Sequence, residues 1–74
     1  MDFKYDKAIG KRIRDLREKK GLTQEELAFR MQVNGCDITR SALAKIEVGQ
    51  RHIYSDEIKC FAKVLGVSYP EIFV

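Results

Sequence analysis

The chain has 74 residues, which is enough for one small hydrophobic core but not for a core beside a separate catalytic cleft. Apolar residues make up 45% of it and charged residues 34%, which argues against disorder and against a membrane span. The formal charge of +3 fits a polyanionic partner but is common among proteins that bind no nucleic acid. The N-terminus is charged and lacks the apolar core of a signal peptide, so we expect one cytoplasmic domain over residues 1–74.

The first predicted helix is capped by Asp6 and runs to about Lys20. Apolar side chains recur in it at helical spacing, and Gly21 is a stop signal. Gly10 lies inside this helix, where glycine is less favourable than alanine by up to ~1 kcal/mol. Its presence indicates either close packing of two backbones or simple tolerance.

A capping box predicts the start of the second helix. Glu26 follows Thr23 by three residues, so the hydroxyl can accept from a backbone amide while the carboxylate accepts from the Thr23 amide. The helix runs from about Gln24 to a residue between 31 and 33. The turn dipeptide Asn34-Gly35 then ends it.

Thr39 predicts the start of a third helix over about residues 40–48, stopped by Gly49. One face of this helix is cationic and polar and the opposite face is apolar: Arg40, Ser41 and Lys45 lie on the first, Leu43 and Ile46 on the second. A helix of this kind can enter a DNA groove without giving up its contribution to the core.

Two further helices are predicted in the C-terminal part. One covers about residues 56–65, and a shorter one starts at a second capping-box pattern, formed by Ser68 and Glu71 around Pro70, and reaches Phe73. Every apolar stretch has the helical period and none alternates like a strand. The sequence therefore predicts an all-α fold of five helices.

The cysteines give little support for a metal or a disulfide. Cys36 and Cys60 lack CxxC spacing, and His52 is the single histidine that could join them in a metal site. We therefore expect no metal and no cofactor. Cys36 falls in the turn near the third helix, where its oxidation would interfere with binding to that helix.

The chain contains, in order, the segments LTQEELA, ITRSALAKIEVGQR and AKVLGVS. Together they resemble the phage repressor and Cro helix-turn-helix family, also called the XRE-like regulators, and the match covers nearly the whole chain. The resemblance implies a compact, five-helix, lambda-repressor-like domain whose second and third helices form the helix-turn-helix. It also implies a homodimer on a palindromic operator.

The resemblance assigns DNA contacts to named positions. The residues that match base-contacting positions of the recognition helix are Arg40, Ser41, Ala44 and Lys45. Arg40 and Lys45 would read guanine, because a cationic donor satisfies the two acceptors on the guanine edge. The residues that match phosphate contacts are Thr23, Gln24, Thr39, Gln50, Arg51 and His52. Free backbone amides and the positive dipole end at the start of the second helix favour an anion at Thr23 and Gln24.

Two further features follow from the resemblance. Arg17 and Glu47 match a family ion pair between the first and third helices, whose role is structural. The chain departs from the family between Met31 and Ile38, where residues 32–37 make a longer turn. This extension either lengthens the second helix or alters how far the third helix projects.

One apolar group has two interpretations. Cys60 and Val64 form a second row beside the core stripe of the fourth helix; with Tyr69, Ile72 and Phe73 they either cover a partner subunit or complete the core.

The leading hypothesis is a sequence-specific transcriptional regulator, a repressor, that binds double-stranded DNA through the major groove as a homodimer. The alternative is a protein-interaction module with the same fold, such as an antitoxin or anti-repressor. An enzyme fits worst, because no nucleophile has a base beside it in sequence and His52 has no evident catalytic partner. The operator and any small-molecule effector stay open.

Overall fold

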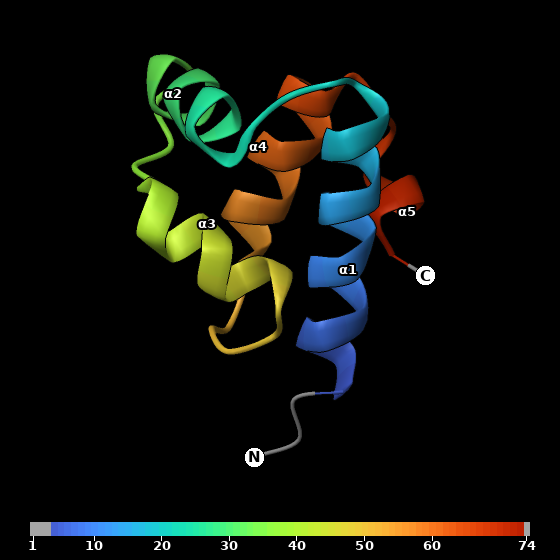
Figure 1. The fold of residues 1–74 in the computed structure, drawn as a ribbon. Coiled ribbons are helices and arrows are strands. Elements are labelled where there is room, and N and C mark those ends of the chain that lie inside the picture. Colours follow the sequence, from blue (N-terminus) through green and yellow to red (C-terminus); the bar gives the residue numbers. More distant parts are fainter. Residues whose placement is uncertain (1–3, 74) are drawn as a thin grey trace.

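The computed structural model describes residues 4–73, which form helices joined by short turns and contain no strand. The helices are α1 (Lys4–Lys19), α2 (Gln24–Val33), α3 (Arg40–Glu47), α4 (Ser55–Leu65) and α5 (Tyr69–Ile72) (Figure 1). This confirms the all-α prediction; α1 begins three residues earlier than a helix capped by Asp6 would, and the other helix ends shift by at most one residue. The radius of gyration is 10.9 Å, close to the ~11 Å expected of a compact chain of this length. None of the described helices is long and apolar enough to span a membrane.

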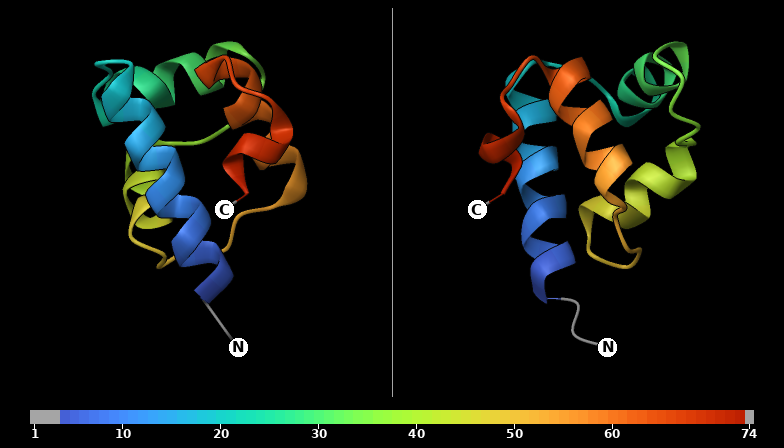
Figure 2. Two further views of the ribbon diagram at one scale, coloured as in Figure 1. Left: turned by 90° about the vertical axis from the view of Figure 1, so that its right-hand side faces the viewer. Right: turned by 180° about the vertical axis from the view of Figure 1, so that it is seen from behind.

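The helices pack in three groups. α1 and α4 lie side by side, with α2 and α3 on one side of this pair and α5 on the other (Figure 2). α3 packs against both α1 and α2, and α2 also contacts α4. The helix-turn-helix is therefore held from behind by the two longest helices, which leaves one side of α3 outside the core.

Asp6 does not cap α1, and this prediction was wrong. The helix begins at Lys4, and Asp6 lies in its first turn with a buried side chain. One carboxylate oxygen accepts from the backbone amide of Ile53 at 3.4 Å, and the other lies 3.2 Å from His52 Nδ1. A residue type that caps helices can equally bind a distant loop, and the local sequence does not distinguish the two uses.

Two glycines allow α1 to lie close to α3 and the loop after it. A Cβ atom on Gly10 would lie 1.9 Å from the carbonyl oxygen of Ile46. A Cβ on Gly49 would lie 2.9 Å from the Cα of Lys7, and Gly49 also has a φ of +77°. Gly10 therefore marks close packing of two backbones and is more than a tolerated residue.

The motif helices both begin at threonine caps. Thr23 Oγ1 accepts from the Glu26 amide at 3.0 Å, and Glu26 Oε1 accepts from the Thr23 amide at 2.9 Å, which confirms the capping box. These hydrogen bonds lower the pKa of Glu26 from its usual value. Thr39 Oγ1 accepts from the Ala42 amide at 3.1 Å. Local side-chain chemistry thus fixes where α2 and α3 start.

The capping box predicted at Ser68 is absent. Ser68 precedes α5, but its hydroxyl makes no capping bond within the described chain; the Glu71 amide donates to the Ser68 backbone carbonyl at 3.0 Å instead. α5 ends at Ile72 and does not include Phe73. Arg12 Nε donates to the Glu71 carbonyl at 2.9 Å, which ties α5 to α1.

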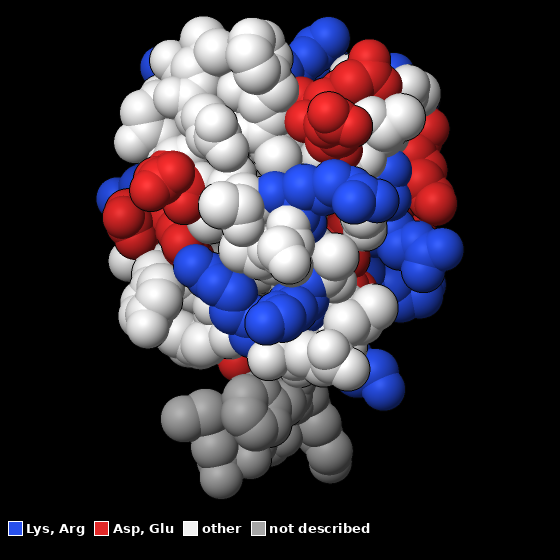
Figure 3. All heavy atoms as spheres, turned by 60° about the vertical axis from the view of Figure 1, so that its left-hand side comes forward, with Lys and Arg blue, Asp and Glu red and all other residues white. Residues whose placement is uncertain are grey.

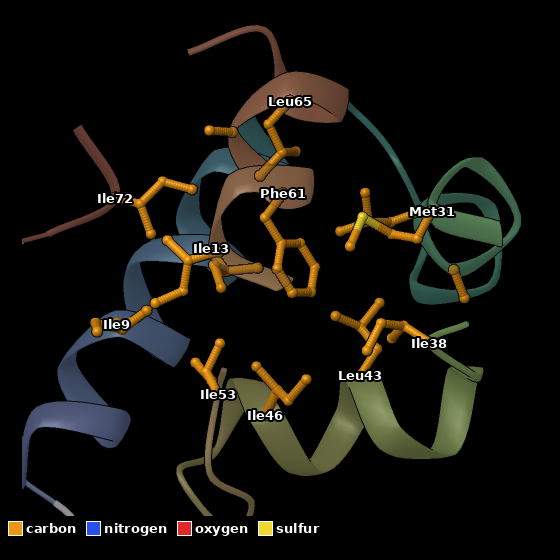
Figure 4. Close-up of a cluster of buried hydrophobic side chains, with 14 of the residues drawn as sticks. Ile9, Ile13, Met31, Ile38, Leu43, Ile46, Ile53, Phe61, Leu65 and Ile72 are labelled. Carbon is orange, nitrogen blue, oxygen red and sulfur yellow. The ribbon is translucent and has the colours of Figure 1, made fainter. Parts of the chain in front are cut away.

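Phe61 of α4 fills the centre of the core, with side chains from α1, α2 and α3 around it (Figure 4). All five helices contribute buried apolar residues, among them Ile9, Ile13, Leu27, Met31, Leu43, Ile46, Leu65 and Ile72. Leu43 and Ile46 anchor α3, and burying each contributes ~1.5–3 kcal/mol. The back of α3 is therefore fixed and its outer face is free to bind.

Candidate nucleic-acid interface

The outer face of α3 carries three side chains without internal partners. Arg40, Ser41 and Lys45 are exposed, and within residues 4–73 none of them makes a side-chain hydrogen bond or an ion pair. Ala44 lies between them and is half-buried. All four predicted base-contacting residues thus share the side of α3 that is directed away from Leu43 and Ile46.

The charge around this face is mostly positive. In Figure 3, Lys and Arg side chains spread over the middle and lower part of one face, and Asp and Glu form separate groups towards its margins. The first turn of α3 contains no acidic residue, while the first turn of α2 contains Glu25 and Glu26. A phosphate therefore meets less repulsion at the start of α3 than at the start of α2.

Behind this face lies a buried ion pair between α1 and α3, at the positions that the family resemblance implies. Arg17 Nε donates to Glu47 Oε2 at 2.7 Å and Arg17 Nη2 donates to Glu47 Oε1 at 3.0 Å, with side chains only 10% and 2% exposed. Arg17 Nη1 also donates to the Leu22 carbonyl at 2.7 Å. The hydrogen bonds with Glu47 raise the pKa of Arg17. The pair joins α1, α3 and the segment leading into α2.

Gln24 is attached to the same pair. Its side-chain Nε2 donates to Glu47 Oε1 at 3.1 Å, and the residue is half-buried. Thr23, beside it, is exposed, but its hydroxyl and amide both belong to the capping box. The start of α2 therefore uses most of its polar groups internally.

Arg51 is also engaged inside the protein. Its Nη1 and Nη2 atoms donate to Glu57 Oε1 and Oε2, each at 2.9 Å, and Nη1 donates to the His52 carbonyl at 2.9 Å. The Tyr54 amide donates to Glu57 Oε1 at 3.1 Å. Burial opposes ionisation of Glu57, but the bonds from Arg51 and Tyr54 prevail and lower its pKa. The guanidinium thus organises the loop that follows α3.

The other two loop residues are more available. Gln50 is exposed, and its backbone amide donates to the Lys45 carbonyl at 2.9 Å. The His52 ring is half-exposed, with Nδ1 beside Asp6 and the Tyr54 ring edge-on to it at 5.0 Å between centroids. Two of the three predicted phosphate contacts in this loop therefore keep a polar group directed to solvent.

Part of the long segment between Met31 and Ile38 is helical and extends α2. α2 continues two residues beyond Met31, to Val33. The remaining turn is closed by a bond from the Cys36 amide to the Met31 carbonyl at 2.9 Å. Gln32 Nε2 donates across it to the Ile38 carbonyl at 3.1 Å. The extension is therefore an ordered, hydrogen-bonded segment.

Asp6 and Glu57 are the site residues whose roles sequence reasoning missed. Both are buried carboxylates that hold the loop after α3. Glu57 lies three residues after Tyr54 at a helix start, a spacing that could have identified it as the residue that binds the Tyr54 amide. No comparable signal links Asp6 to His52, because the two are far apart in sequence.

The comparisons with known proteins agree with this geometry. Residues 13–72 match a family described as helix-turn-helix. The control protein C.BamHI of Bacillus amyloliquefaciens is 37% identical over 60 residues, which cover 80% of this chain and 68% of that protein. The restriction-modification controller protein C.AhdI from Aeromonas hydrophila has a structure similar to this one, with a TM-score of 0.83, 35% identity and 96% of each chain covered. The clp gene regulator ClgR from C. glutamicum has a TM-score of 0.81 and 25% identity, covering 92% of this chain and 82% of ClgR.

These matches fix the family. The helix-turn-helix match spans far more than half of the chain and contains α2, the long turn and α3. The relatives are described as a control protein, a controller protein and a gene regulator. The chain therefore belongs to the XRE-like, or Cro-like, helix-turn-helix family of transcription regulators, which bind DNA and are not enzymes.

Proposed function

We propose that the protein is a cytoplasmic repressor that binds a palindromic operator as a homodimer, with residues 1–74 acting as one DNA-binding domain. The observation that carries this proposal is the outer face of α3, where Arg40, Ser41 and Lys45 have no internal partner although the back of the helix is fully buried. A rigid helix with free donors on its outer face is what major-groove reading requires. Repression follows from occupation of the operator, which excludes polymerase.

Arg40 and Lys45 are the base readers in this proposal. Each can donate to the O6 and N7 acceptors of guanine, while the small side chain of Ala44 leaves room for a thymine methyl group. Ser41 adds a hydroxyl that can donate or accept. Sequence preference thus comes from α3, and the surrounding contacts position it.

The phosphate contacts differ in how freely they can be made. Gln50 and His52 present groups to solvent, and Thr39 marks the start of α3, whose first turn contains no acidic residue. Gln24 and Arg51 already bind carboxylates and would act mainly by positioning α2 and the loop after α3. The backbone amides near Thr23 add the partial positive charge of a helix start.

A homodimer is supported by an aromatic cluster formed by α1, α5 and Phe73, which follows α5. The Tyr5 and Phe73 rings are 5.9 Å apart between centroids, and the Tyr69 and Phe73 rings are 5.0 Å apart. Tyr5 is 60% exposed, although nothing in the sequence marked it as a surface residue for a partner. Ile72 is fully buried and belongs to the core. Burying this cluster in a symmetric interface would give the dimer a second reading helix.

Selection of bound duplexes from a random pool tests the proposal. We expect an inverted repeat whose half-sites lie about one helical turn (~34 Å) apart, with affinity that falls steeply as salt rises. Sedimentation of the protein with and without the selected duplex gives the stoichiometry. Enrichment of no sequence, or a single half-site bound by one chain, would contradict the operator and the dimer, respectively.

The alternative of a protein-interaction module is favoured by one feature, the outer face of α2. Phe29 and Val33 are 67% and 69% exposed and lie one helical turn apart. A triple Arg40→Ala, Ser41→Ala, Lys45→Ala variant separates the two functions. Loss of DNA binding supports the repressor; a wild-type chain that binds a partner protein but no duplex supports the module.

A further inference from the structure

The long turn between α2 and α3 meets α4 at a pair of cysteines. Cys36 lies in the turn and Cys60 lies on α4, and both side chains are half-buried free thiols packed against the core. Residues 34–37 of the turn and residues 56, 57 and 60 of α4 together form a surface pocket of about 370 Å³. Both cysteines line this pocket, one from each segment, so the two thiols face the same small cavity and are open to small reagents.

The Cys60 thiol is close enough to the Cys36 thiol to affect its pKa. Burial, followed by the neighbouring Cys60 thiol, raises the pKa of the Cys36 thiol to about 12. The carboxylates of Glu57 and Asp56, which form the same pocket wall, act in the same direction. Cys36 is therefore a thiol and not a thiolate at neutral pH.

We propose that Cys36 and Cys60 form a reversible disulfide that locks the α2–α3 turn to α4 and weakens DNA binding. The sequence has no other cysteine, so an intramolecular disulfide can join only these two residues. The effect on DNA rests on the proposed function, but formation of the bond does not.

The oxidant that the reaction requires is a hydroperoxide. It oxidises one thiol to a sulfenic acid and leaves as water or an alcohol. The second thiol then attacks the sulfenic sulfur, which forms the S–S bond and releases one water molecule. Two thiols are oxidised and one peroxide is reduced. A dithiol reductant reverses the step by thiol–disulfide exchange.

The position of α3 links this bond to DNA binding. α3 spans residues 40–47 and therefore lies entirely inside the loop that a Cys36–Cys60 bond closes. Bonded sulfur atoms are ~2.05 Å apart, so the bond draws the turn towards α4. The Thr39 cap and Arg40 follow Cys36 closely and would move with it. A small displacement of the reading helix disturbs base contacts, which tolerate little misplacement.

The test treats the full chain, reduced and dilute, with hydrogen peroxide, and then counts free thiols by maleimide labelling and intact mass. We expect both thiols to disappear with loss of two hydrogen atoms, the chain to remain monomeric on a non-reducing gel, and dithiothreitol to restore the thiols. The midpoint of thermal unfolding should rise by roughly 10 °C, because the bond restricts the unfolded chain. Cys36→Ser and Cys60→Ser should each abolish this rise, because the one cysteine that remains cannot form an intramolecular disulfide.

Other oxidation products would overturn the disulfide: sulfinic acid on one cysteine, disulfide-linked dimers, or two thiols that survive treatment. DNA binding is then measured on the selected operator, where we expect oxidation to lower affinity at least ~10-fold in the wild type and not in Cys60→Ser. Equal affinity of the oxidised and reduced chains would overturn the regulatory role and leave the cross-link standing. Reduced protein that binds no duplex would instead contradict the proposed repressor, and the thiol count would still decide the disulfide.

Discussion

The cations around α3 fall into two groups that charge and helical spacing alone do not separate; the family resemblance placed Arg17 in an ion pair but assigned Arg51 to a phosphate. Arg40 and Lys45 have no partner inside the described part of the protein and are exposed. Arg17 and Arg51 each donate two hydrogen bonds to one carboxylate, Glu47 and Glu57 respectively. All four lie near the proposed DNA surface or match family positions near it. The first two can bind DNA, whereas the other two hold the elements that position them.

The two groups of cations differ in whether a buried carboxylate lies beside them. Glu47 and Glu57 are buried acids, and a buried charge requires a partner. Each takes the nearest guanidinium, which is then no longer available to a phosphate. Within residues 4–73 the buried acids are Asp6, Glu47 and Glu57, and none of them bonds to Arg40 or Lys45. Charge alone therefore does not identify a ligand-binding cation; the burial of the neighbouring acids decides.

The largest expected effect comes from breaking the buried pair. Glu47→Ala leaves Arg17 buried without its carboxylate, which should reduce the free energy of unfolding by ~3–5 kcal/mol in urea denaturation. Asp15→Ala is the matched control, because Asp15 pairs with Lys11 on the exposed side of α1 at 3.6 Å. The control should cost below ~0.5 kcal/mol. Equal effects of the two variants would contradict the structural role of Arg17.

Replacing a free cation should weaken DNA binding and leave stability nearly unchanged. Arg40→Ala or Lys45→Ala should weaken operator binding by ~1–3 kcal/mol, or about 5- to 150-fold, by fluorescence anisotropy. The free energy of unfolding should change by less than ~0.5 kcal/mol, because neither side chain has an internal partner. A large loss of stability without loss of DNA affinity would show that these cations belong to the second group.

The Arg51–Glu57 pair should show an intermediate effect on stability. Arg51→Ala leaves a mostly buried carboxylate and should cost ~1–3 kcal/mol of unfolding free energy. Its effect on operator affinity should be smaller than that of Arg40→Ala. An affinity loss as large as that of Arg40→Ala, with unchanged stability, would make Arg51 a direct DNA contact.

The same pair predicts a dependence of stability on pH. The pKa of Glu57 is lower in the folded protein than in the unfolded chain, so its ionised form favours folding. This contribution is complete above the unfolded pKa, which is ~4.3, and is lost as the pH falls through the lower, folded value. Glu57→Gln should therefore differ from the wild type most at pH 7 and least below ~pH 4. Asp56→Asn, at the exposed neighbouring position, is the control for the loss of one acidic charge.

Gln50 should give the smallest effect. It is exposed in the loop after α3, and a phosphate contact from it carries no sequence information. Gln50→Ala should weaken binding to selected and random duplexes alike, by a few-fold. A loss confined to the selected operator would make Gln50 a base reader.

Local chemistry explains which parts of the fold could be predicted. Thr23 and Thr39 cap helices with groups three residues away, and both starts were found from the sequence. Asp6 has the same short polar character but binds a loop far along the chain, so its predicted cap was wrong. At Ser68 the backbone carbonyl, and not the side-chain hydroxyl, accepts from the Glu71 amide. Side chains with distant partners are those for which sequence spacing gives no signal.

The same reasoning holds for the candidate site. The exposed face of α3 followed from helical period alone, since Leu43 and Ile46 determine which side is buried. The internal bonds of Gln24 and Arg51 could not be predicted in that way, because they depend on how Glu47 and Glu57 are buried by other helices. Tyr5 could not be assigned to the aromatic cluster from the sequence, because its contact with the Phe73 ring depends on the packing of α5 against α1.

The most direct test compares the specificity ratio, the affinity for the selected operator divided by that for random duplex, in three proteins at one salt concentration. The account predicts that Arg40→Ala, Lys45→Ala lowers this ratio towards one, whereas Arg51→Ala keeps it near the wild-type value while lowering the midpoint of unfolding. If the double α3 variant retains the wild-type ratio, or if Arg51→Ala is the one that loses it, the division between free and internally paired cations is wrong.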